Sequence, residues 1–479
     1  MQENVLSMDM LLSYAPLSEK LQEAVHEDVE KKRKKLNRKI IVLDDDPTGT
    51  QTVHDINVYT DWEENSIRAG FEEASNMFFI LTNSRSFSSR HTEEVHRIIG
   101  ERIAKIAEEC GRDYILVSRG DSTLRGHYPL ETETLREAIE RKSAKRFDGE
   151  IIFPFFVEGG RYTIGNIHYA QDENKLVPVG KTEFAKDRTF GYRSSDLTEW
   201  CEEKTNGQYR ADKVTAVTLE ELRSCNIKKI TEKLLQICNF NKVIVNAIDY
   251  EDIAVFLNAY FNALETGKEY LFRSAASLVK ALGGISSRPL LNCKKELANT
   301  SKSGGIIIVG SHVQKTTDQL EYLKNGNLPL EFIQYNQHRV LEENGLQKET
   351  ESVAAEAEKL VKEGRTVVVY TRRERLDLDT DDPEKQLEVS TKISEAIVQV
   401  IAKLQVQPHF LIAKGGITSS DIATKAMHIW RARVLGQIEP GIPVWLTGPE
   451  SKFPGMAYII FPGNVGNEKT LFRIVSKLL

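Results

Sequence analysis

The stretch Ile40-Ile41-Val42-Leu43-Asp44-Asp45-Asp46-Pro47-Thr48-Gly49-Thr50 decides the fold class, because an apolar β-branched run leads directly into three carboxylates and a turn. The run predicts a buried strand, and the Pro-Thr-Gly segment predicts a turn at its carboxyl end. In parallel α/β sheets, ligands bind beyond the carboxyl ends of the strands. The acidic cluster therefore indicates a base, a metal ligand or a hydroxyl-orienting group. A polar turn is the alternative, but three adjacent carboxylates repel one another, which favours a functional site.

Short apolar runs alternate with helical stretches along the chain, which predicts βαβ units and a mostly parallel sheet in each half of an α/β protein. The expected strands of the first half are residues 40–43, 56–59, 77–81, 114–117, 151–153, 214–217 and 243–245. Those of the second half are residues 306–309, 331–334, 366–370, 410–413, 444–446 and 457–461.

Between about residues 250 and 304 the pattern becomes helical and then loose, with glycine and serine at both ends of the loose segment. Such a change of composition is typical of a domain junction. We therefore expect a helical extension over residues 1–38, an α/β domain over residues 39–285 and a second α/β domain over residues 300–479.

Composition excludes several classes of protein. The formal charge of -6 over 479 residues, with no long basic tract beyond Lys31–Lys35, argues against a dedicated nucleic-acid binder. The five cysteines are scattered and form no C-x-x-C pair, which indicates a reduced compartment and no zinc site. No apolar run approaches about twenty residues and no signal peptide is evident. We expect a cytoplasmic protein without a membrane partner.

Arginine and hydroxyl residues follow three expected strands of the first half. The loops are Thr82–Ser86, Ser118–Gly126 and Glu158–Thr163. Arginine pairs bidentately with carboxylates, while aspartate and serine bind hydroxyl groups. Because all three loops lie at carboxyl ends of strands, they indicate a small anionic, polyhydroxylated ligand.

Glycine and small hydroxyl residues follow three expected strands of the second half. The loops are Gly310–Thr317, Lys414–Asp421 and Pro462–Asn467. Small residues let the backbone approach phosphate oxygens, and amides at a helix N-terminus favour an anion. Any one of these loops alone could be an ordinary helix cap, but the three together favour a phosphate or nucleotide site.

Several familiar motifs are missing. Gly180-Lys181-Thr182 is not a Walker A motif, because position 175 is lysine where the motif requires glycine, and no G-x-G-x-x-G or H-E-x-x-H occurs. His91 and His96 are expected at the surface, since a spacing of five does not stack them on one helix face. The loop histidines are expected to be hydrogen-bonding bystanders. These are His54, His127, His168 and His312.

A series of short motifs resembles, in order, those of the four-carbon acid sugar kinases, a family formerly described as a domain of unknown function. In the first half they are Asp45–Gly49, Ser84–Ser86, Asp121–Gly126 and Gly160–Thr163; in the second they are Gly310-Ser311, Gly415–Thr418 and Gly463–Gly466. The resemblance implies an ATP-dependent kinase of threonate, erythronate or a 3-oxo-tetronate. It also implies a sugar-acid-binding domain, a nucleotide-binding domain and an active site in the cleft between them.

Carried over residue by residue, the resemblance implies a role for each matched position. The substrate would contact Arg85, Arg119, Gly120, Asp121 and Ser122. ATP would contact Ser311, Gly415, Gly416, Thr418, Gly463, Asn464, Val465 and Gly466. Asp45 or Asp46 would accept or orient the proton of the substrate hydroxyl, and ATP would carry Mg²⁺ without a protein metal ligand. A homodimer is left open.

Two other functions stay open at this point. A metal-dependent hydrolase or phosphatase would use Asp44, Asp45 and Asp46 as ligands, although it would have no need of a nucleotide domain. A non-catalytic regulator would bind sugar acid and nucleotide without turnover. Release of ADP with a panel of four-carbon acids distinguishes the kinase from both alternatives.

Overall fold

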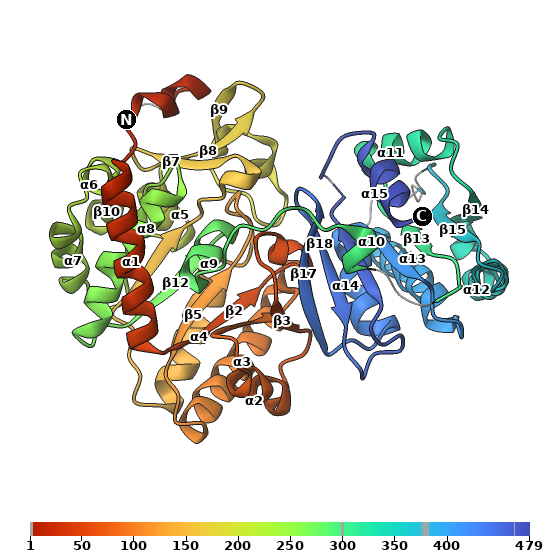
Figure 1. Cartoon of the computed structure of the whole chain (residues 1–479), viewed down its shortest axis with the longest axis horizontal. Helices are drawn as coiled ribbons and strands as arrows, with labels where there is room; N and C mark the ends of the chain where they lie inside the picture. The colour runs from red at the N-terminus through yellow and green to blue at the C-terminus, as the bar shows by residue number, and fades with distance from the viewer. Residues whose placement is uncertain (1–2, 298–300, 375, 377–382, 464) are drawn as a thin grey trace. The chain divides into compact units, whose positions relative to one another are not determined.

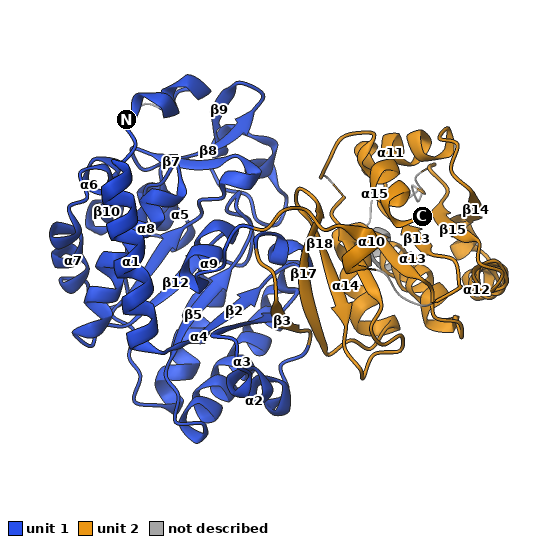
Figure 2. Cartoon of the chain, viewed as in Figure 1, with its two compact units in different colours: residues 1–52, 61–287 blue, residues 53–60, 288–479 orange. Residues whose placement is uncertain are grey.

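The computed structural model describes residues 3–297, 301–374, 376, 383–463 and 465–479, without the side chains of residues 383–388. The chain forms two compact units, shown in Figure 2. Unit 1 comprises residues 1–52 and 61–287, and unit 2 comprises residues 53–60 and 288–479. Each unit holds a largely parallel sheet flanked by helices (Figure 1), so the expected α/β class is confirmed.

The main sheet of unit 1 is parallel, in the strand order β10-β11-β6-β12-β5-β2-β4. Its strands are β2 (Lys39–Asp44), β4 (Met77–Leu81), β5 (Tyr114–Arg119), β6 (Gly149–Phe153), β10 (Thr215–Val217), β11 (Asn241–Val245) and β12 (Tyr270–Ser274). Every residue of β2, β4 and β5 is buried, as expected of strands covered on both faces. The carboxyl ends of β2, β5 and β12 adjoin, because Asp44 and Ser274 both pair with Arg119.

Helices surround this sheet. They are α1 (Glu19–Leu36), α2 (Glu64–Glu72), α3 (Ser89–Glu109), α4 (Leu130–Lys142), α5 (Leu197–Lys204), α6 (Leu219–Arg223), α7 (Ile227–Leu235), α8 (Tyr250–Glu265) and α9 (Ala276–Gly283). Helix α1 packs against α8 and buries Val25 and Val29, so the leading helix is part of unit 1 (Figure 1). Helices α3 and α4 approach closely at Gly100, where a Cβ would lie 2.8 Å from that of Ala138.

Unit 1 also contains a small antiparallel sheet that the sequence pattern did not indicate. It consists of β1 (Leu6–Ser7), β7 (Arg161–Ile164), β8 (Ile167–Asp172) and β9 (Lys175–Pro178). Strand β12 was likewise missed, in a region expected to be helical and then loose. Its three apolar residues are followed by Arg273 and Ser274, so neither helical nor strand periodicity is visible in so short a run.

The sheet of unit 2 has the order β3-β17-β18-β19-β16-β13-β15-β14. Its strands are β3 (Ile56–Tyr59), β13 (Ile306–Val309), β14 (Leu330–Tyr335), β15 (Thr366–Thr371), β16 (Phe410–Lys414), β17 (Arg431–Glu439), β18 (Ile442–Thr447) and β19 (Ala457–Phe461). The strands from β19 to β14 are parallel, whereas β3, β17, β18 and β19 pair antiparallel.

Strand β3 was expected among the strands of the first half, but it pairs with β17 of unit 2, with Val58 opposite Ala432. Strand β17 itself was not anticipated, because charged and polar residues interrupt its apolar positions. The carboxyl ends of β13, β16 and β19 adjoin, since Lys414 pairs with both Val309 and Phe461.

The helices of unit 2 are α10 (Cys293–Glu296), α11 (Gln314–Lys324), α12 (Gly345–Lys362), α13 (Pro383–Lys403), α14 (Gly416–Asp421) and α15 (Thr470–Leu478). Helix α11 follows β13 and α14 follows β16, so two helices begin beside the adjoining strand ends. Within the described residues, none of the helices in either unit is long and apolar enough to cross a membrane.

Candidate functional sites

The acidic cluster of unit 1 begins with a buried ion pair. Asp44 ends β2 and Arg119 ends β5, and Asp44 Oδ1 lies 3.1 Å from Arg119 Nη1. Only 1% of the Asp44 side chain and 4% of the Arg119 side chain are exposed. Burial raises the pKa of Asp44 to about 7, although Arg119 opposes this shift. Gly49 closes over the carboxylate, because a Cβ there would lie 1.9 Å from Asp44 Oδ2.

Arg85 binds the other two carboxylates. It lies in the turn after β4, where its Nη2 and Nε are 2.6 and 3.1 Å from the two oxygens of Asp45. Burial raises the pKa of Asp45, with Arg85 and Arg119 opposing the shift. Asp46 lies 3.5 Å from Arg85 Nη1 and keeps 18% of its side chain exposed, against 3% for Asp45. Asp46 is therefore the carboxylate of the cluster that a ligand can reach.

A buried glutamate lies behind this pair. Ser84 donates a hydrogen bond of 2.6 Å to Glu131 Oε1 at the start of α4, and only 2% of Glu131 is exposed. His96 faces the same glutamate and is 1% exposed, so its expected surface position was wrong. Burial lowers the pKa of His96, and its Nδ1 bonds to the carbonyl of Thr92 one turn earlier on α3. The helix face that carries His96 packs inward, which the spacing from His91 could not show.

The loop after β5 is held by Arg273, a residue that no sequence motif indicated. The Gly120 amide donates to the Ser274 carbonyl at 3.0 Å. A Cβ on Gly120 would lie 1.5 Å from Arg273 Nη1, so only glycine leaves room for the guanidinium at this position. Arg273 Nη2 donates to the Arg125 carbonyl at 3.1 Å. Gly120 therefore leaves space for the Arg273 side chain, and its amide is hydrogen-bonded to the last residue of β12.

Asp121 and Ser122 continue this loop. Burial disfavours ionisation of Asp121, but Arg85 and Arg125 outweigh it and hold the pKa of Asp121 well below its ordinary value. The Asp121 carboxylate accepts a hydrogen bond of 2.7 Å from Arg125 Nε. His168 Nε2 donates to the Ser122 carbonyl at 2.8 Å, which leaves Nδ1 as acceptor for the Thr163 hydroxyl at 2.9 Å.

The loop histidines make hydrogen bonds rather than a cluster. Burial lowers the pKa of His168 to about 4, so its ring is neutral near pH 7. His127 Nε2 donates to the Phe87 carbonyl at 3.0 Å, and His54 lies 2.9 Å from a carboxylate oxygen of Asp55. Within the described ranges, no three histidine, cysteine, aspartate or glutamate side chains are grouped as a metal would require.

In unit 2, the three glycine-rich loops converge. A Cβ on Gly310 would lie 2.7 Å from Thr418 Oγ1, and a Cβ on Gly463 would lie 3.2 Å from Ser311 Oγ. Gly415 has a φ of +127° and stands between them, since a Cβ there would lie 3.3 Å from Thr418 Oγ1 and 3.4 Å from Ser311 Cβ. The structure thus brings together residues that are more than a hundred positions apart. Their small side chains leave room for phosphate oxygens beside the backbone, although Gly415 itself is buried and its amide donates to the Phe461 carbonyl at 2.8 Å.

The remaining predicted nucleotide residues are placed differently. Gly416 is the first residue of α14, and Gly466 has a φ of +80°. Val465 packs partly against the core of unit 2, and its carbonyl accepts a hydrogen bond of 3.1 Å from Gln319. Asn464 lies outside the described residues.

Two cations support these loops. Arg373 was not predicted, and Lys414 lay within a predicted loop but was not named as a binding residue. Lys414 ends β16, is fully buried and donates to the carbonyls of Pro462 and Gly463 at 2.6 and 3.3 Å. Burial lowers the pKa of Lys414 to about 7, and nearby Lys315 adds to the shift. Arg373, just after β15, donates to the Ser311 carbonyl at 2.7 Å. The signal for Lys414 was a charge at the end of the apolar run 410–413, and that for Arg373 was a pair of arginines after the strand that ends at Thr371.

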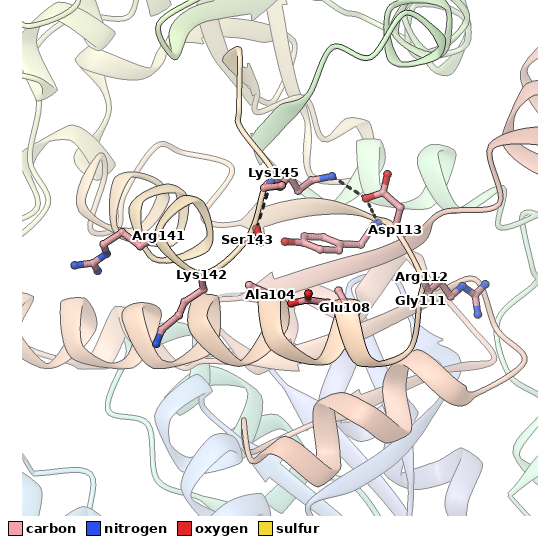
Figure 3. A pocket seen from close by; sticks show the side chains of 12 residues that line it. Ala104, Glu108, Gly111, Arg112, Asp113, Arg141, Lys142, Ser143 and Lys145 are labelled. Carbon is pink, nitrogen blue, oxygen red and sulfur yellow. Dashed lines mark hydrogen bonds and ion pairs between the residues drawn. The ribbon is translucent and has the colours of Figure 1, made fainter.

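A separate pocket of about 620 Å³ lies between the carboxyl ends of α3 and α4 (Figure 3). Its lining includes Tyr114, Arg112 and Lys145, and Lys145 Nζ is 2.8 Å from Asp113 Oδ1. Tyr114 begins β5 whereas Arg119 ends it. The pocket is therefore at the opposite end of the strand from the acidic cluster.

Comparison with known proteins assigns both units to described domains. Residues 40–282 match the sugar-binding N-terminal domain, and residues 306–471 match the nucleotide-binding C-terminal domain. No curated protein matches the chain.

Two crystal structures have a similar fold. One is a proposed tRNA synthase from Salmonella typhimurium LT2, with a TM-score of 0.62 and 15% identity over 91% of this chain and 98% of that one. The other is a Haemophilus influenzae protein of family DUF1537, with a TM-score of 0.56 and 16% identity over 92% of this chain and 100% of that one. The chain belongs to the family that joins a sugar-binding N-terminal domain to a nucleotide-binding C-terminal domain, the architecture of the four-carbon acid sugar kinases.

Proposed function

We propose that this protein transfers the γ-phosphate of ATP to a hydroxyl group of a four-carbon sugar acid of the threonate, erythronate or 3-oxo-tetronate type. The observation that carries the proposal is the pairing of two different sites in one chain. The sugar-binding unit presents the accessible Asp46 beside a fixed Arg85–Asp45 pair. The nucleotide-binding unit presents a cradle of small residues around Ser311 and Gly415. Phosphoryl transfer requires both, because the enzyme chiefly positions its reactants and compensates charge.

Asp46 is the group that we assign to the substrate hydroxyl. The hydroxyl oxygen forms a bond to the γ-phosphorus, the bond from that phosphorus to the ADP oxygen breaks, and the hydroxyl proton passes to Asp46. The Thr48 amide donates to Asp46 Oδ1 at 2.8 Å, and Arg85 lies 3.5 Å from Oδ2. These contacts orient the carboxylate while leaving part of it open. Asp45 acts as a positioning residue, because both of its oxygens bind Arg85.

The ATP phosphates are assigned to the loops that converge on Ser311, Gly415, Thr418 and Gly463. The small residues of these loops let phosphate oxygens approach the backbone, which suits a crowded polyanion. The Gly415 amide already donates to the Phe461 carbonyl at 2.8 Å, so the donors proposed for the phosphates are the amides that follow it at the start of α14. ATP is expected to carry Mg²⁺, which neutralises phosphate charge when it is bound. Gly416 and Gly466 are proposed to complete the cradle.

The alternatives fit less well. A hydrolase that used the acidic cluster for a divalent cation would have to displace Arg85 from Asp45, a contact of 2.6 Å, and Arg119 from Asp44, a contact of 3.1 Å. Arginines so placed compensate the carboxylate charge that would attract a metal. A regulator without turnover would need no accessible carboxylate beside the substrate hydroxyl. A cytoplasmic location and a homodimer remain expectations.

Release of ADP in the presence of threonate, erythronate and 3-oxo-tetronate tests the proposal. We expect ATP-dependent turnover of at least one acid. Asp46→Asn should lower kcat by about 10²- to 10⁴-fold with the KM for ATP retained, because it removes the proton acceptor. Asp212→Asn is the matched control, since Asp212 is 55% exposed and, within the described part of the chain, forms ion pairs with its neighbours Arg210 and Lys213 alone. Phosphate release without ATP would indicate the hydrolase, and binding without turnover would indicate the regulator.

A further inference from the structure

Most arginines in the loops of the sugar-binding unit already have carboxylate partners. The pairs are Arg85–Asp45, Arg119–Asp44 and Arg125–Asp121. An arginine that is neutralised in this way has less attraction left for an anionic ligand. The carboxylate of an acid substrate would therefore have to compete with aspartates that are already bound. This raises the question of which cation is available to it.

Arg161 is an exception. It begins β7, directly after Gly160, whose φ of +70° turns the chain into the strand. Arg161 has no carboxylate within ion-pair distance in the described part of the chain, where its guanidinium donates only to the Gly159 carbonyl. Its Nε is buried and lacks an acceptor there. A guanidinium has five N–H donors, so most of its capacity is unused.

The surroundings of Arg161 hold its guanidinium in place. The guanidinium carbon lies 5.6 Å from the centre of the Phe184 ring, which limits the orientations that the planar group can adopt. Burial lowers the pKa of Arg161, and Asp121 opposes the shift through its charge. Arg161 is therefore a partly desolvated cation whose charge is not fully compensated.

The hairpin that carries Arg161 is tied to the predicted substrate loop. Thr163 on β7 and the Ser122 carbonyl are bridged by His168, with hydrogen bonds of 2.9 and 2.8 Å. Arg161 and Arg125 both lie over the Phe184 ring, at 5.6 and 5.1 Å, and Arg125 Nε is 2.7 Å from Asp121. Arg161 is thus held beside the loop that carries Asp121 and Ser122.

Arg273 also lacks an ion pair in the described ranges, but it is 4% exposed and lies beneath Gly120. A ligand cannot reach it without moving the loop after β5. Arg161 keeps part of its surface exposed and so remains accessible.

We propose that Arg161 binds the carboxylate of the sugar-acid substrate. Two parallel N–H bonds from Nη1 and Nη2, rather than from the buried Nε, would hold the carboxylate in one plane, with the chain of hydroxyls extending toward Asp46. The assignment rests on the proposed function, since it supplies the anion-binding part of the same substrate site. It implies that the site distinguishes an acid from its neutral amide, because the amide cannot form a charge-compensated pair with the fork.

The test measures binding and turnover of threonate, erythronate and their neutral amides by Arg161→Gln, Arg161→Lys and wild-type protein. Arg193→Gln is the matched control, because Arg193 is 92% exposed. Isothermal titration should show that Arg161→Gln weakens acid binding by about 10- to 100-fold, the loss expected for charged hydrogen bonds. Amide binding and the KM for ATP should be unchanged, so the preference for acid over amide should disappear. Arg161→Lys should recover part of the preference.

The outcomes separate this inference from the proposed function. If Arg161→Gln keeps the wild-type preference for acid over amide, the assignment of Arg161 is overturned while the kinase function stands. If the wild type binds acid without forming ADP, the kinase function fails, and loss of the preference in Arg161→Gln still supports the carboxylate site. If the wild type binds none of the acids, both proposals are overturned. An equal loss for acid and amide would assign Arg161 a structural role and overturn the inference.

Discussion

Gly120→Ala tests the contact on which the loop after β5 depends. The added Cβ would lie 1.5 Å from Nη1 and 2.2 Å from the guanidinium carbon of Arg273. Non-bonded atoms normally stay about 3.5 Å apart, so the guanidinium would have to move by roughly 2 Å. Arg273 is 4% exposed and has little room to move.

The cost follows from what Arg273 loses. Its hydrogen bond of 3.1 Å to the Arg125 carbonyl would break. A hydrogen bond to a charged group contributes about 1.5–3 kcal/mol, and an off-rotamer side chain costs about 0.5–1.5 kcal/mol. We therefore expect Gly120→Ala to destabilise this part of unit 1 by about 2–4 kcal/mol.

Hydrogen exchange of peptides that span β5 and β12 measures this cost locally. A loss of about 2–4 kcal/mol corresponds to a fall in protection of roughly 30- to 1000-fold. Peptides from β16 and β19 of unit 2 serve as an internal control and should be unchanged. The double variant Gly120→Ala/Arg273→Ala should be more stable than the sum of the two single changes predicts, because it removes the collision. Additivity within about 0.5 kcal/mol would refute the proposed contact.

Three further changes probe other parts of the molecule. Lys414→Met should raise the KM for ATP by about tenfold and leave the KM for the acid unchanged. The substitution removes the ammonium group that donates to the Pro462 and Gly463 carbonyls at 2.6 and 3.3 Å. An equal rise in both KM values would contradict this role. Burial lowers the pKa of His168 from 6.5 to about 4, so the unfolded chain takes up the proton first. The free energy of unfolding of unit 1, measured by hydrogen exchange, should therefore fall by about 3 kcal/mol between pH 6.5 and pH 4. The same dependence of this free energy on pH in His168→Asn would exclude His168 as the cause. Lys242→Met should destabilise unit 1 by about 3–5 kcal/mol, because it removes the cation 2.6 Å from the buried Glu150 carboxylate and leaves it with the hydrogen bond from the Tyr128 hydroxyl. Adding Glu150→Gln should restore part of this loss in denaturant titrations, and a failure to recover would show that the ion pair is not responsible.

The strands that were predicted are those with long apolar runs, such as residues 40–43 and 306–309. A buried parallel strand must be apolar on both faces, so its signal is local and can be read from a few residues. Strand β12 was missed because its five residues include Arg273 and Ser274, and that arginine is needed by a loop 150 positions away. Strand β3 was assigned to the wrong half because its partner, β17, follows it by more than 370 residues.

The predictions of site residues were likewise limited to what a few consecutive residues can show. Strand ends identified the loops around Asp45, Asp121, Ser311 and Gly415, since a chemical function placed after an apolar run is visible in the chain. The structure then showed that Arg119 is buried against Asp44 and that the Gly120 amide is committed to Ser274. No sequence pattern reports which arginine pairs with which aspartate, because several pairings satisfy the same composition.

The sequence by itself determined the α/β class and placed two chemically different sets of loops after the ends of strands, one in each half of the chain. Each depends on the order of residues within a single strand and its following turn. Only the tertiary structure decided that Asp46 is the more accessible carboxylate and that Arg85 and Arg119 are already paired. It also decided that Arg161 has no carboxylate partner among the residues that the structure describes. The physical reason is distance: charge compensation and hydrogen bonding change completely over one or two ångströms, and those distances are set by the packing of elements that lie far apart in the chain.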